Sequence, residues 1–577
     1  MEKLKIIFKI SCLYFILLSP AANQAFAYYN NNQYLRSLQY LQYQQRQQRM
    51  DTSDALPPSI KMKSEDFPFK LHNCVEINLI TVENAYKLSP STVHHITKKW
   101  ENRCLTVDDL HQLLNTLNQQ YIDQKYITSR MYFPKQDLSS RHLRISAMEG
   151  KLESFIFNGE EKGTYEFLAF PWQRNDVLDF EDIAQGIDQL NRIPNWEISM
   201  KIVPGQDPNA SVVNIELPNA GIIHGKVFSD NYSQSNSGRT MGRSIVTTGN
   251  LLHLLDVWSF EYDHSLNARQ SIGHNSFFTV QGSIPMGPWI FFGGWWRSDD
   301  MYNPTYIKNY PQRADSTQKN FHAGFSRVIN RTRIDVTSIR IEYQTETFEN
   351  YTNHQKLRSQ SATLSSLNIS ANEFLKIWGR TWFLSLGSKI GLNEMATKTY
   401  VVNTGEYNPH VKYVKPFIDI DGYSPITKSL VWHTSIHGEY SNKNQYNNSK
   451  IQIGGPYTVR GFLKQSLIGN AGIFMRNDLF WTLPTEHMKC GSYQGFCDTF
   501  IKGTEIYTLL DTGMIRAVFD HSTQSNIRKS GNIAGSGIGI RRTGKRFIWD
   551  ASATHAITTS GLRPEGWIAS FQAGVNF

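Results

Sequence analysis

The sequence predicts a transmembrane antiparallel β-barrel of about sixteen strands, preceded by two small α/β units and an N-terminal helix. Three features of its 577 residues predict this fold: an export signal, a long region of alternating polar and apolar residues, and an aromatic final strand. The mean hydropathy of −0.42 and the 19% charged residues are also found in soluble proteins. They do not exclude a barrel, because every second strand residue of a barrel faces a polar lumen.

Residues 1–27 predict a cleaved signal peptide. Lys3, Lys5 and Lys9 form a basic start, residues 6–18 are mostly apolar, and residues 25–27 read Ala-Phe-Ala, which is the expected cleavage pattern. No later stretch approaches the length of a membrane-spanning apolar helix. The mature chain is therefore expected outside the cytoplasm, where disulfides persist.

Residues 28–50 are rich in Asn and Gln and carry leucines at three-residue spacing. This pattern is compatible with a weakly amphipathic polar helix, and the composition fits a disordered tail equally well. Residues 51–68 contain Pro57-Pro58 and predict a linker.

Two small α/β units are expected next, at residues 69–149 and 150–218. In the first, we expect strands at 75–79, 126–128 and 143–145 and a helix at 108–121. In the second, we expect strands at 151–157, 196–203 and 211–217 and a helix at 180–190. Such tandem mixed units are typical of adaptor modules, and no catalytic cleft is evident in them.

Four cysteines remain after Cys12 leaves with the signal peptide. They form two local pairs, Cys74 with Cys104 and Cys490 with Cys497. An even number without neighbouring histidines favours disulfides over a metal site. Three connectivities remain open, and the local one is preferred.

Residues 219–577 are expected to form the barrel. Helical periodicity disappears there, and Trp258-Phe260-Tyr262 alternates with Ser259-Glu261-Asp263. Ile339-Ile341-Tyr343 alternates with Arg340-Glu342-Gln344 in the same way. Burying such polar side chains in a dry sandwich would cost several kcal/mol each, whereas a water-filled lumen removes that cost. About 360 residues correspond to roughly fourteen to eighteen strands.

The final strand presents aromatic and apolar residues on one face and ends on an aromatic residue. Phe571, Val575 and Phe577 lie on that face together with Trp567. This arrangement resembles the C-terminal signature by which outer-membrane barrels are recognised for insertion.

Two motifs suggest transport. Residues 454–462 read Gly-Gly-Pro-Tyr-Thr-Val-Arg-Gly-Phe, and residues 507–513 read Tyr-Thr-Leu-Leu-Asp-Thr-Gly. Together they resemble the Val-Arg-Gly-Phe/Tyr loop and the Asp-x-Gly strand of the two-partner secretion transporters, TpsB family, haemolysin secretion/activation branch. The resemblance implies that the loop folds into the lumen and that Arg460 pairs with Asp511. The flanking residues expected to pack there are Val459, Gly461, Phe462 and Gly513.

The resemblance extends along most of the mature chain. Residues 182–194 resemble the helix and turn of the family's second POTRA (polypeptide-transport-associated) domain, so the two α/β units are identified as POTRA domains. Cys74 and Cys104 stand where the haemolysin branch has a cysteine pair. Asp230-Asn231-Tyr232 with Gly238-Arg239 resembles the first barrel strand and turn. Residues 28–50 would then be the family's plug helix, although they lack strong charge patterning.

The resemblance implies an outer-membrane transporter with POTRA domains in the periplasm. Its partners would be an unfolded cognate exoprotein, outer-membrane lipid and, during biogenesis, the barrel assembly machinery. The exoprotein could be a haemolysin, an adhesin or a contact-dependent toxin, and the cysteine pair favours the first. The alternatives are an insertase, which usually has more POTRA units and no plug, and a general porin, which needs no adaptor.

The sequence offers no site for chemistry. No phosphate-binding loop, nucleophile elbow or zinc-protease motif is present, so we expect no cofactor, no metal and no enzymatic activity. The formal charge of +9 is spread along the chain without a basic block, which disfavours nucleic-acid binding.

Overall fold

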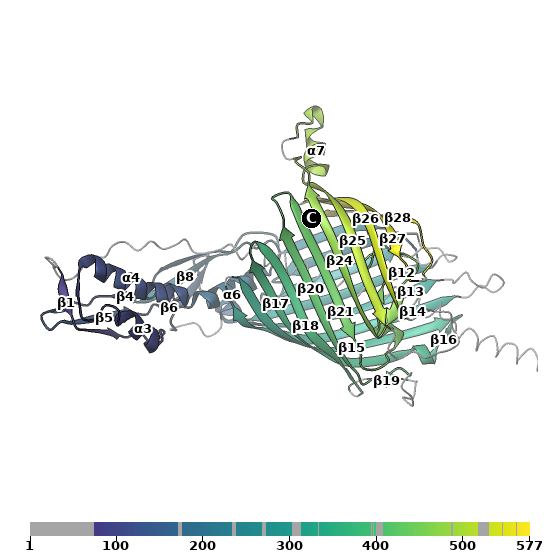
Figure 1. Cartoon of the computed structure of the whole chain (residues 1–577). Helices are drawn as coiled ribbons and strands as arrows, with labels where there is room; N and C mark the ends of the chain where they lie inside the picture. The colour runs from purple at the N-terminus through teal and green to yellow at the C-terminus, as the bar shows by residue number, and fades with distance from the viewer. Residues whose placement is uncertain are drawn as a thin grey trace, which may run out of the picture.

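The computed structural model describes residues 74–577, except for 171–175, 234–237, 268–272, 303–312, 333, 394, 396, 400–407, 486–487, 517–529, 545 and 561. The predicted signal peptide, N-terminal helix and linker lie outside the described residues. Two α/β units follow one another along the chain and lead into a large barrel (Figure 1).

The first unit packs helices α3 (Pro90–Thr97) and α4 (Val107–Asp123) against a small sheet. That sheet consists of β2 (Leu79–Glu83), β5 (His142–Met148) and β4 (Arg130–Tyr132), and a separate two-stranded sheet pairs β1 (Val75–Ile77) with β3 (Arg103–Leu105). Strand β2 runs parallel to β5, and β4 pairs antiparallel on the other side of β5. Helix α4 forms because its leucines recur on one face, and Leu110, Leu113 and Leu117 are fully buried in the core of the unit.

The strand expected at residues 126–128 is wrong. Lys125 adopts a positive φ of 71°, and the N–H of Tyr126 donates to the carbonyl of Tyr121 at 2.9 Å. These residues therefore close the C-terminus of α4 in a turn, and the strand β4 begins only at Arg130. The need to satisfy the helix end overrides the strand propensity of Tyr, Ile and Thr.

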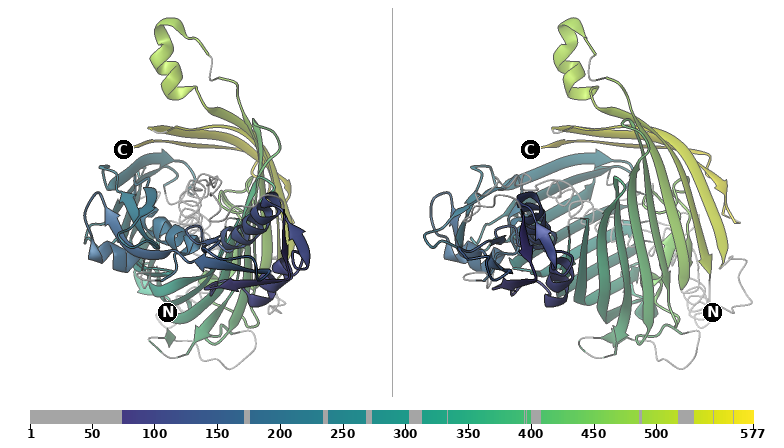
Figure 2. Two further views of the ribbon diagram at one scale, coloured as in Figure 1. Left: turned by 90° about the vertical axis from the view of Figure 1, so that its left-hand side faces the viewer. Right: turned by 60° about the vertical axis from the view of Figure 1, so that its left-hand side comes forward.

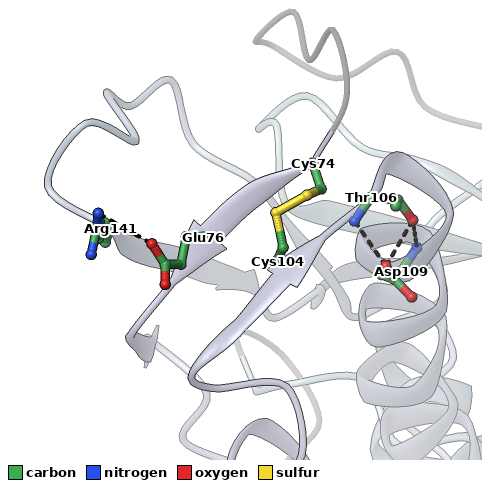
Figure 3. The surroundings of a disulfide bond; sticks show 6 residues. All are labelled: Cys74, Glu76, Cys104, Thr106, Asp109 and Arg141. Carbon is green, nitrogen blue, oxygen red and sulfur yellow. Dashed lines mark hydrogen bonds and ion pairs between the residues drawn. A yellow bond between two sulfur atoms is a disulfide. The ribbon is translucent and has the colours of Figure 1, made fainter.

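One end of the first unit is held by a disulfide and a helix cap (Figure 3). Cys74 and Cys104 are disulfide-bonded and join β1 to its partner strand β3. Directly after β3, the Thr106 hydroxyl accepts from the Asp109 N–H, and the Asp109 carboxylate accepts from the Thr106 N–H at 2.8 Å. This reciprocal capping box satisfies donors at the start of α4 that have no partner within the helix.

The second unit repeats the plan around helices α5 (Gly163–Ala169) and α6 (Phe180–Asn191). Its three-stranded sheet has the order β6 (Lys151–Phe157), β8 (Ala210–Glu216), β7 (Ser199–Pro204), with β6 and β8 parallel. Its buried core includes Phe155 and Phe170, whose rings stack at 4.1 Å. Gly186 is needed on α6 because a Cβ there would lie 2.0 Å from the Phe170 ring.

Sixteen long antiparallel strands then close into a barrel, which confirms the predicted fold class. They are β9 (Ile223–Asp230), β10 (Met241–Gly249), β11 (Val257–Ser265), β12 (His274–Met286), β13 (Trp289–Tyr302), β14 (Ala314–Arg331), β15 (Asp335–Thr352), β17 (Ala362–Ile377), β18 (Arg380–Leu392), β20 (Val414–Pro425), β21 (Leu430–Tyr440), β24 (Ala471–Thr482), β25 (Thr504–Arg516), β26 (Gly531–Thr543), β27 (Phe547–Thr558) and β28 (Trp567–Asn576). The first strand, β9, pairs with the last, β28. The two-residue strands β16 (Gln355–Lys356) and β19 (Lys398–Thr399) add short pairings at one rim.

The alternation read from the sequence separates the two faces of the wall. Phe260 and Tyr262 of β11 are exposed on the outside, whereas Glu261 and Asp263 are buried inside. Arg243 of β10 lies between Asp263 and Asp230 and forms ion pairs with both. The outer face is therefore apolar and the inner face carries paired charges, as a lipid-embedded barrel requires.

The second α/β unit is docked onto one end of the barrel, which we call the proximal end. The Gly287 N–H of the β12–β13 turn donates to the Leu168 carbonyl of α5 at 2.7 Å, and the Gln189 amide of α6 donates to the Gly287 carbonyl at 2.6 Å. Arg331 at the end of β14 forms an ion pair with Asp188 of α6. The apolar core of the unit also includes Leu255 from the barrel.

The turns at the proximal end are short, with one exception. The connections at 250–256, 287–288, 332–334, 378–379, 426–429 and 544–546 are brief, whereas the β24–β25 connection spans residues 483–503. It contains helix α7 (Gln494–Phe500) and the disulfide Cys490–Cys497. The expectation that helices end after residue 217 is therefore wrong at this point, because seven residues are too few to show a helical period. Within the described ranges, no helix is long and apolar enough to cross a membrane.

Candidate functional site

The segment between β21 and β24, residues 441–470, folds back against the barrel wall. It contains a short hairpin of β22 (Ile451–Ile453) and β23 (Leu467–Gly469), and the predicted motif lies between these two strands. Its apolar side chains join wall residues in one buried cluster: Ile451, Ile453, Val459, Phe462, Leu467, Phe474, Ile515, Ile533 and Ala556. The loop thus has a core of its own, shared with β24 to β27.

This cluster lies on the inner face of the wall. Phe474 and Ile515 are buried beneath the loop, while their chain neighbours Ile473 and Met514 are exposed. Because successive side chains of a strand point to opposite faces, the loop covers the lumen side and the exposed pair belongs to the outer side. The part of the loop that carries these cluster residues, from Ile451 to Leu467, therefore lies on the lumen side of the wall.

Arg460 fastens the loop to two strands. Its Nε donates to Asp511 Oδ2 at 2.6 Å and its Nη2 to Asp511 Oδ1 at 2.7 Å, while the Arg460 backbone N–H also donates to Oδ2 at 2.9 Å. Its Nη1 lies 2.7 Å from Asp478 Oδ1 on β24. The guanidinium fork thus bridges β24 and β25, a geometry that a lysine ammonium could not reproduce.

The second carboxylate, Asp478, is part of a wider charged network. His433 of β21 lies with Nδ1 3.6 Å from Asp478 and with Nε2 3.3 Å from Asp421 of β20. The His433 ring stacks on Tyr423 at 4.3 Å. Among the described residues, no group of three or more His, Cys, Asp or Glu could hold a metal ion.

Glycines allow the loop to approach the wall. A Cβ on Gly535 of β26 would lie 1.7 Å from the Arg460 carbonyl oxygen, and a Cβ on Gly461 would lie 2.7 Å from the backbone of His555. Gly461 also has a φ of 98°, which disfavours other residues. A Cβ on Gly513 would lie 3.0 Å from both Ile453 and Val459. Each of these positions has backbone or packed side chains where a larger residue would place its Cβ.

A carboxylate at the rim opposite the proximal end binds the residues that follow the motif. Glu565, in the β27–β28 connection, accepts from the backbone N–H groups of Leu463, Lys464 and Gln465 at 2.9–3.2 Å. Gln465 in turn exchanges two hydrogen bonds with the backbone of Arg563. The motif is therefore held on one side by Arg460 in the lumen and on the other by Glu565 at the rim.

The structure brings together the six residues that the sequence singled out for the loop. Val459 and Phe462 are buried in the shared cluster, Gly461 and Gly513 lie at close contacts, and Arg460 meets Asp511. Sequence reasoning missed Asp478, Gly535 and Glu565. The alternation of β24 places Asp478 inward, and the repeated glycines of β26 could have pointed to Gly535, but Glu565 lies in a loop without a pattern.

The final strand carries the other predicted residues. Phe571, Val575 and Phe577 are all exposed on the outer face. Strand β28 pairs with β9 over five residues, Gln572 to Asn576, and the Phe577 N–H donates to the Gly225 carbonyl at 2.9 Å beyond this ladder. The chain end therefore lies at the seam that closes the barrel.

A closed sixteen-strand barrel with two tandem α/β units at one end and a tethered loop in its lumen defines a class of outer-membrane transport barrels. Comparison with family models supports this class along the chain. The model described as haemolysin secretion/activation protein ShlB/FhaC/HecB matches residues 209–542. Two POTRA models match residues 75–150, of the ShlB type, and 151–204.

Relatives and solved structures agree with the family models. The outer membrane transporter CdiB of Dickeya dadantii (strain 3937) is 29% identical over 410 residues, covering 71% of this chain and 72% of the relative. The haemolysin transporter protein HpmB of Proteus mirabilis is 23% identical, covering 74% and 75%. The structure of CdiB from Escherichia coli has the same fold, with a TM-score of 0.83 at 23% identity, covering 97% of this chain and 99% of that one.

The chain belongs to the haemolysin secretion/activation protein family. It is an outer-membrane transporter of the two-partner secretion type, and its two POTRA domains lie in the periplasm. The proximal end of the barrel is therefore the periplasmic end. Members of this family act as transporters rather than enzymes.

Proposed function

We propose that the barrel passes an unfolded cognate exoprotein to the cell surface and that residues 441–470 are its gate. One observation supports the proposal of a gate. The loop lies in the lumen and is attached there by Arg460, which lies between two buried carboxylates. A polypeptide cannot share this space with the seated loop. Passage therefore requires Arg460 to leave Asp511 and Asp478 and the loop to swing aside.

The POTRA domains receive the exoprotein. Strand β7 (Ser199–Pro204) forms an edge of the second sheet and β4 (Arg130–Tyr132) an edge of the first. An extended chain can add to such an edge through main-chain hydrogen bonds without a defined sequence. Because the second domain is docked on the barrel end, a chain captured there lies next to the lumen.

No nucleotide site drives the movement in this proposal. The exoprotein folds only after it emerges, and that folding makes its passage irreversible. Residues 28–50 plug the resting pore, as the family resemblance implies, so both the plug and the loop must move before transport begins.

The displacement of the loop can be measured as ionic conductance. Removing one partner of a buried ion pair costs about 3–5 kcal/mol, which would raise the population of the displaced loop by roughly a hundredfold or more. We therefore expect low conductance from the mature protein in planar bilayers, and clearly higher conductance from Arg460→Ala and from a deletion of residues 28–50.

The control is Arg327→Ala, which removes an arginine that lies over Trp289 at 4.9 Å in the barrel wall. It should conduct like the parent. Equal and large conductance in all four proteins would identify an open porin and reject the gate. Deletion of the transporter should abolish secretion of the exoprotein. If the deletion instead depleted other barrels from the outer membrane, the protein would be an insertase.

A further inference from the structure

The long periplasmic connection between β24 and β25 stands apart from the rest of the barrel. We call its described residues, 483–485 and 488–503, the lobe. Outer-membrane barrels usually have short periplasmic turns, and the other periplasmic connections of this chain follow that rule. The lobe instead contains helix α7, and the Cys490–Cys497 disulfide closes residues 490–497 into a loop.

The lobe projects away from the barrel axis rather than over the pore. In Figure 1 it rises from the wall at the end nearest the POTRA domains, and both views of Figure 2 show it outside the ring of strands. All three views separate it from the POTRA domains. A projection from the periplasmic end of the wall, directed away from the barrel axis, lies on the side of the barrel that faces the periplasmic leaflet.

Contacts at the base of the lobe come from the outer face of the wall. Arg542 of β26 shares its face with Ile538 and Ile540, which are exposed on the outside. Its guanidinium donates to the Lys502 carbonyl at 2.8 Å and to the Asp498 carbonyl at 3.1 Å. These carbonyls satisfy a cation that would otherwise face lipid, and they tie the lobe to the lipid-facing side.

An aromatic row continues from this face into the lobe. The Trp549 indole N–H of β27 donates to the Phe500 carbonyl at 3.2 Å, the Phe500 ring lies 5.0 Å from Phe547, and Phe496 lies 5.0 Å from Phe500. Phe547 pairs with Val575, a residue of the outer face. The row therefore begins on the surface that contacts lipid and ends on helix α7 of the lobe.

The lobe exposes apolar side chains that nothing in the described chain covers. Tyr493 is 75% exposed, Phe496 57% and Met488 45%. The exposed Lys489 lies beside them, and Lys502 is paired with Asp498 at 2.6 Å. Aromatic side chains flanked by lysine are the composition that lies at a membrane–water interface.

We propose that the lobe is a lipid anchor that embeds Tyr493, Phe496 and Met488 at the headgroup level of the periplasmic leaflet. Its occupant is the phospholipid surface itself. Because the lobe is fixed to β26 and β27, the anchor would set the depth and tilt of the wall beside the β9–β28 seam. The proposal uses only the outer-membrane location of the barrel and does not depend on the gate.

The test places a polarity-sensitive dye on the lobe. The four cysteines of the mature chain are paired, so Phe496→Cys and, separately, Tyr493→Cys supply one free thiol each for labelling in the full chain. The labelled proteins are reconstituted in phosphatidylethanolamine–phosphatidylglycerol vesicles that carry a quencher either at the headgroup or at mid-chain. Tyr86→Cys, at an exposed residue of the first POTRA domain, is the water-facing control. Leu510→Cys, on the outer face of β25, is the deep control.

We expect both lobe labels to emit at shorter wavelength than the Tyr86 label and to be quenched several-fold more strongly than it by the headgroup quencher. The Leu510 label should respond most to the mid-chain quencher. If the lobe labels behave like the Tyr86 label, the anchor is rejected. It is equally rejected if they become shielded only when the exoprotein is added, since the lobe would then be a docking surface for the cargo.

Discussion

A single backbone oxygen decides how closely the gate can approach the wall. The Arg460 carbonyl lies where a Cβ on Gly535 would come within 1.7 Å, a distance that no relaxation of a side chain can relieve. The same residue uses its guanidinium and its N–H to hold Asp511. Arg460 therefore needs the Asp511 carboxylate beside its guanidinium and a residue without a Cβ, Gly535, beside its carbonyl oxygen.

Gly535→Ala should displace the loop while leaving every charge in place. The added methyl clashes with backbone, so we expect the seated state to be lost and the bilayer conductance to rise towards that of Arg460→Ala. Gly438→Ala is the matched control, because a Cβ there meets its nearest neighbours at an ordinary 3.4 Å. Conductance of Gly535→Ala equal to that of Gly438→Ala would show that the loop tolerates a shift at this position.

Glu565→Gln should weaken the rim contact without opening the lumen fully. The amide keeps one acceptor oxygen for the three N–H groups of residues 463–465, but it loses the charge that strengthens those bonds. A charge-assisted bond contributes about 1.5–3 kcal/mol, so we expect more frequent brief openings in single-channel records than in the parent. The effect should be smaller than that of Asp511→Asn, and an effect of equal or greater size would place the main anchor at the rim.

Only those residues of the gate that belong to a recognisable sequence motif could be predicted. Arg460 and Asp511 stand in two motifs of the same family, so their meeting was expected. Asp478 looks like any other inward-facing carboxylate of a strand, and its role depends on which strand lies beside β25. Glu565 is 102 residues from Leu463 and acts through backbone N–H groups, which carry no sequence signal.

At the scale of elements, the secondary structure of long segments could be predicted from the sequence, and that of short segments could not. The long barrel strands follow from alternation, since each has enough residues to show the period of two. The turn at residues 126–128 and the short helix α7 do not, because tertiary contacts and a disulfide define them. At the start of α4, the local Thr106–Asp109 capping box is enough to fix where the helix begins.

Helix α4 should lose protection at acid pH through this cap. Hydrogen bonds from the Thr106 backbone N–H and hydroxyl hold the pKa of Asp109 below its ordinary value of 3.8. Since the pKa is lower in the folded state, the stabilisation is present above pH 3.8 and is lost as the pH falls through the folded value. Hydrogen exchange at the start of α4, corrected for the intrinsic rate, should show this loss in the parent. Asp109→Asn should remove the dependence, and an unchanged profile would assign it to another group.

At the scale of the whole molecule, the second POTRA domain and the barrel are joined through several turns at once. Contacts come from the β10–β11, β12–β13 and β14–β15 connections, including Asn250 to Tyr165 at 2.7 Å and Arg331 to Asp188. A receiving domain held in this way presents its sheet edge at a constant place relative to the lumen. The sequence predicted both bodies but could not predict this docking, which depends on residues without a shared motif.

Arg331→Ala should loosen the docked domain. The Arg331–Asp188 pair is largely buried, and losing one partner should cost about 1–3 kcal/mol, between the values for exposed and buried pairs. We expect faster hydrogen exchange at the Gly287 N–H, which bonds Leu168 across the interface, together with reduced secretion. Lys201→Ala, which removes an exposed pair with Glu216 inside the domain, is the control. Equal exchange in both variants would show that the apolar contacts alone hold the domain.

The position of the loop in the chain has a consequence for biogenesis. Asp478, Asp511, Gly535, His555 and Glu565 all follow residues 441–470 in sequence. Arg460 and residues 461–465 therefore lack these contacts until the last strands are present, whereas Asn442 and Ser449 contact the earlier residues Val414 and Lys415. Contacts between distant segments form late because closing long loops of chain is entropically slow. The seated motif is therefore a marker of a finished barrel, and a barrel stalled before β25 should leave residues 454–465 open to added protease.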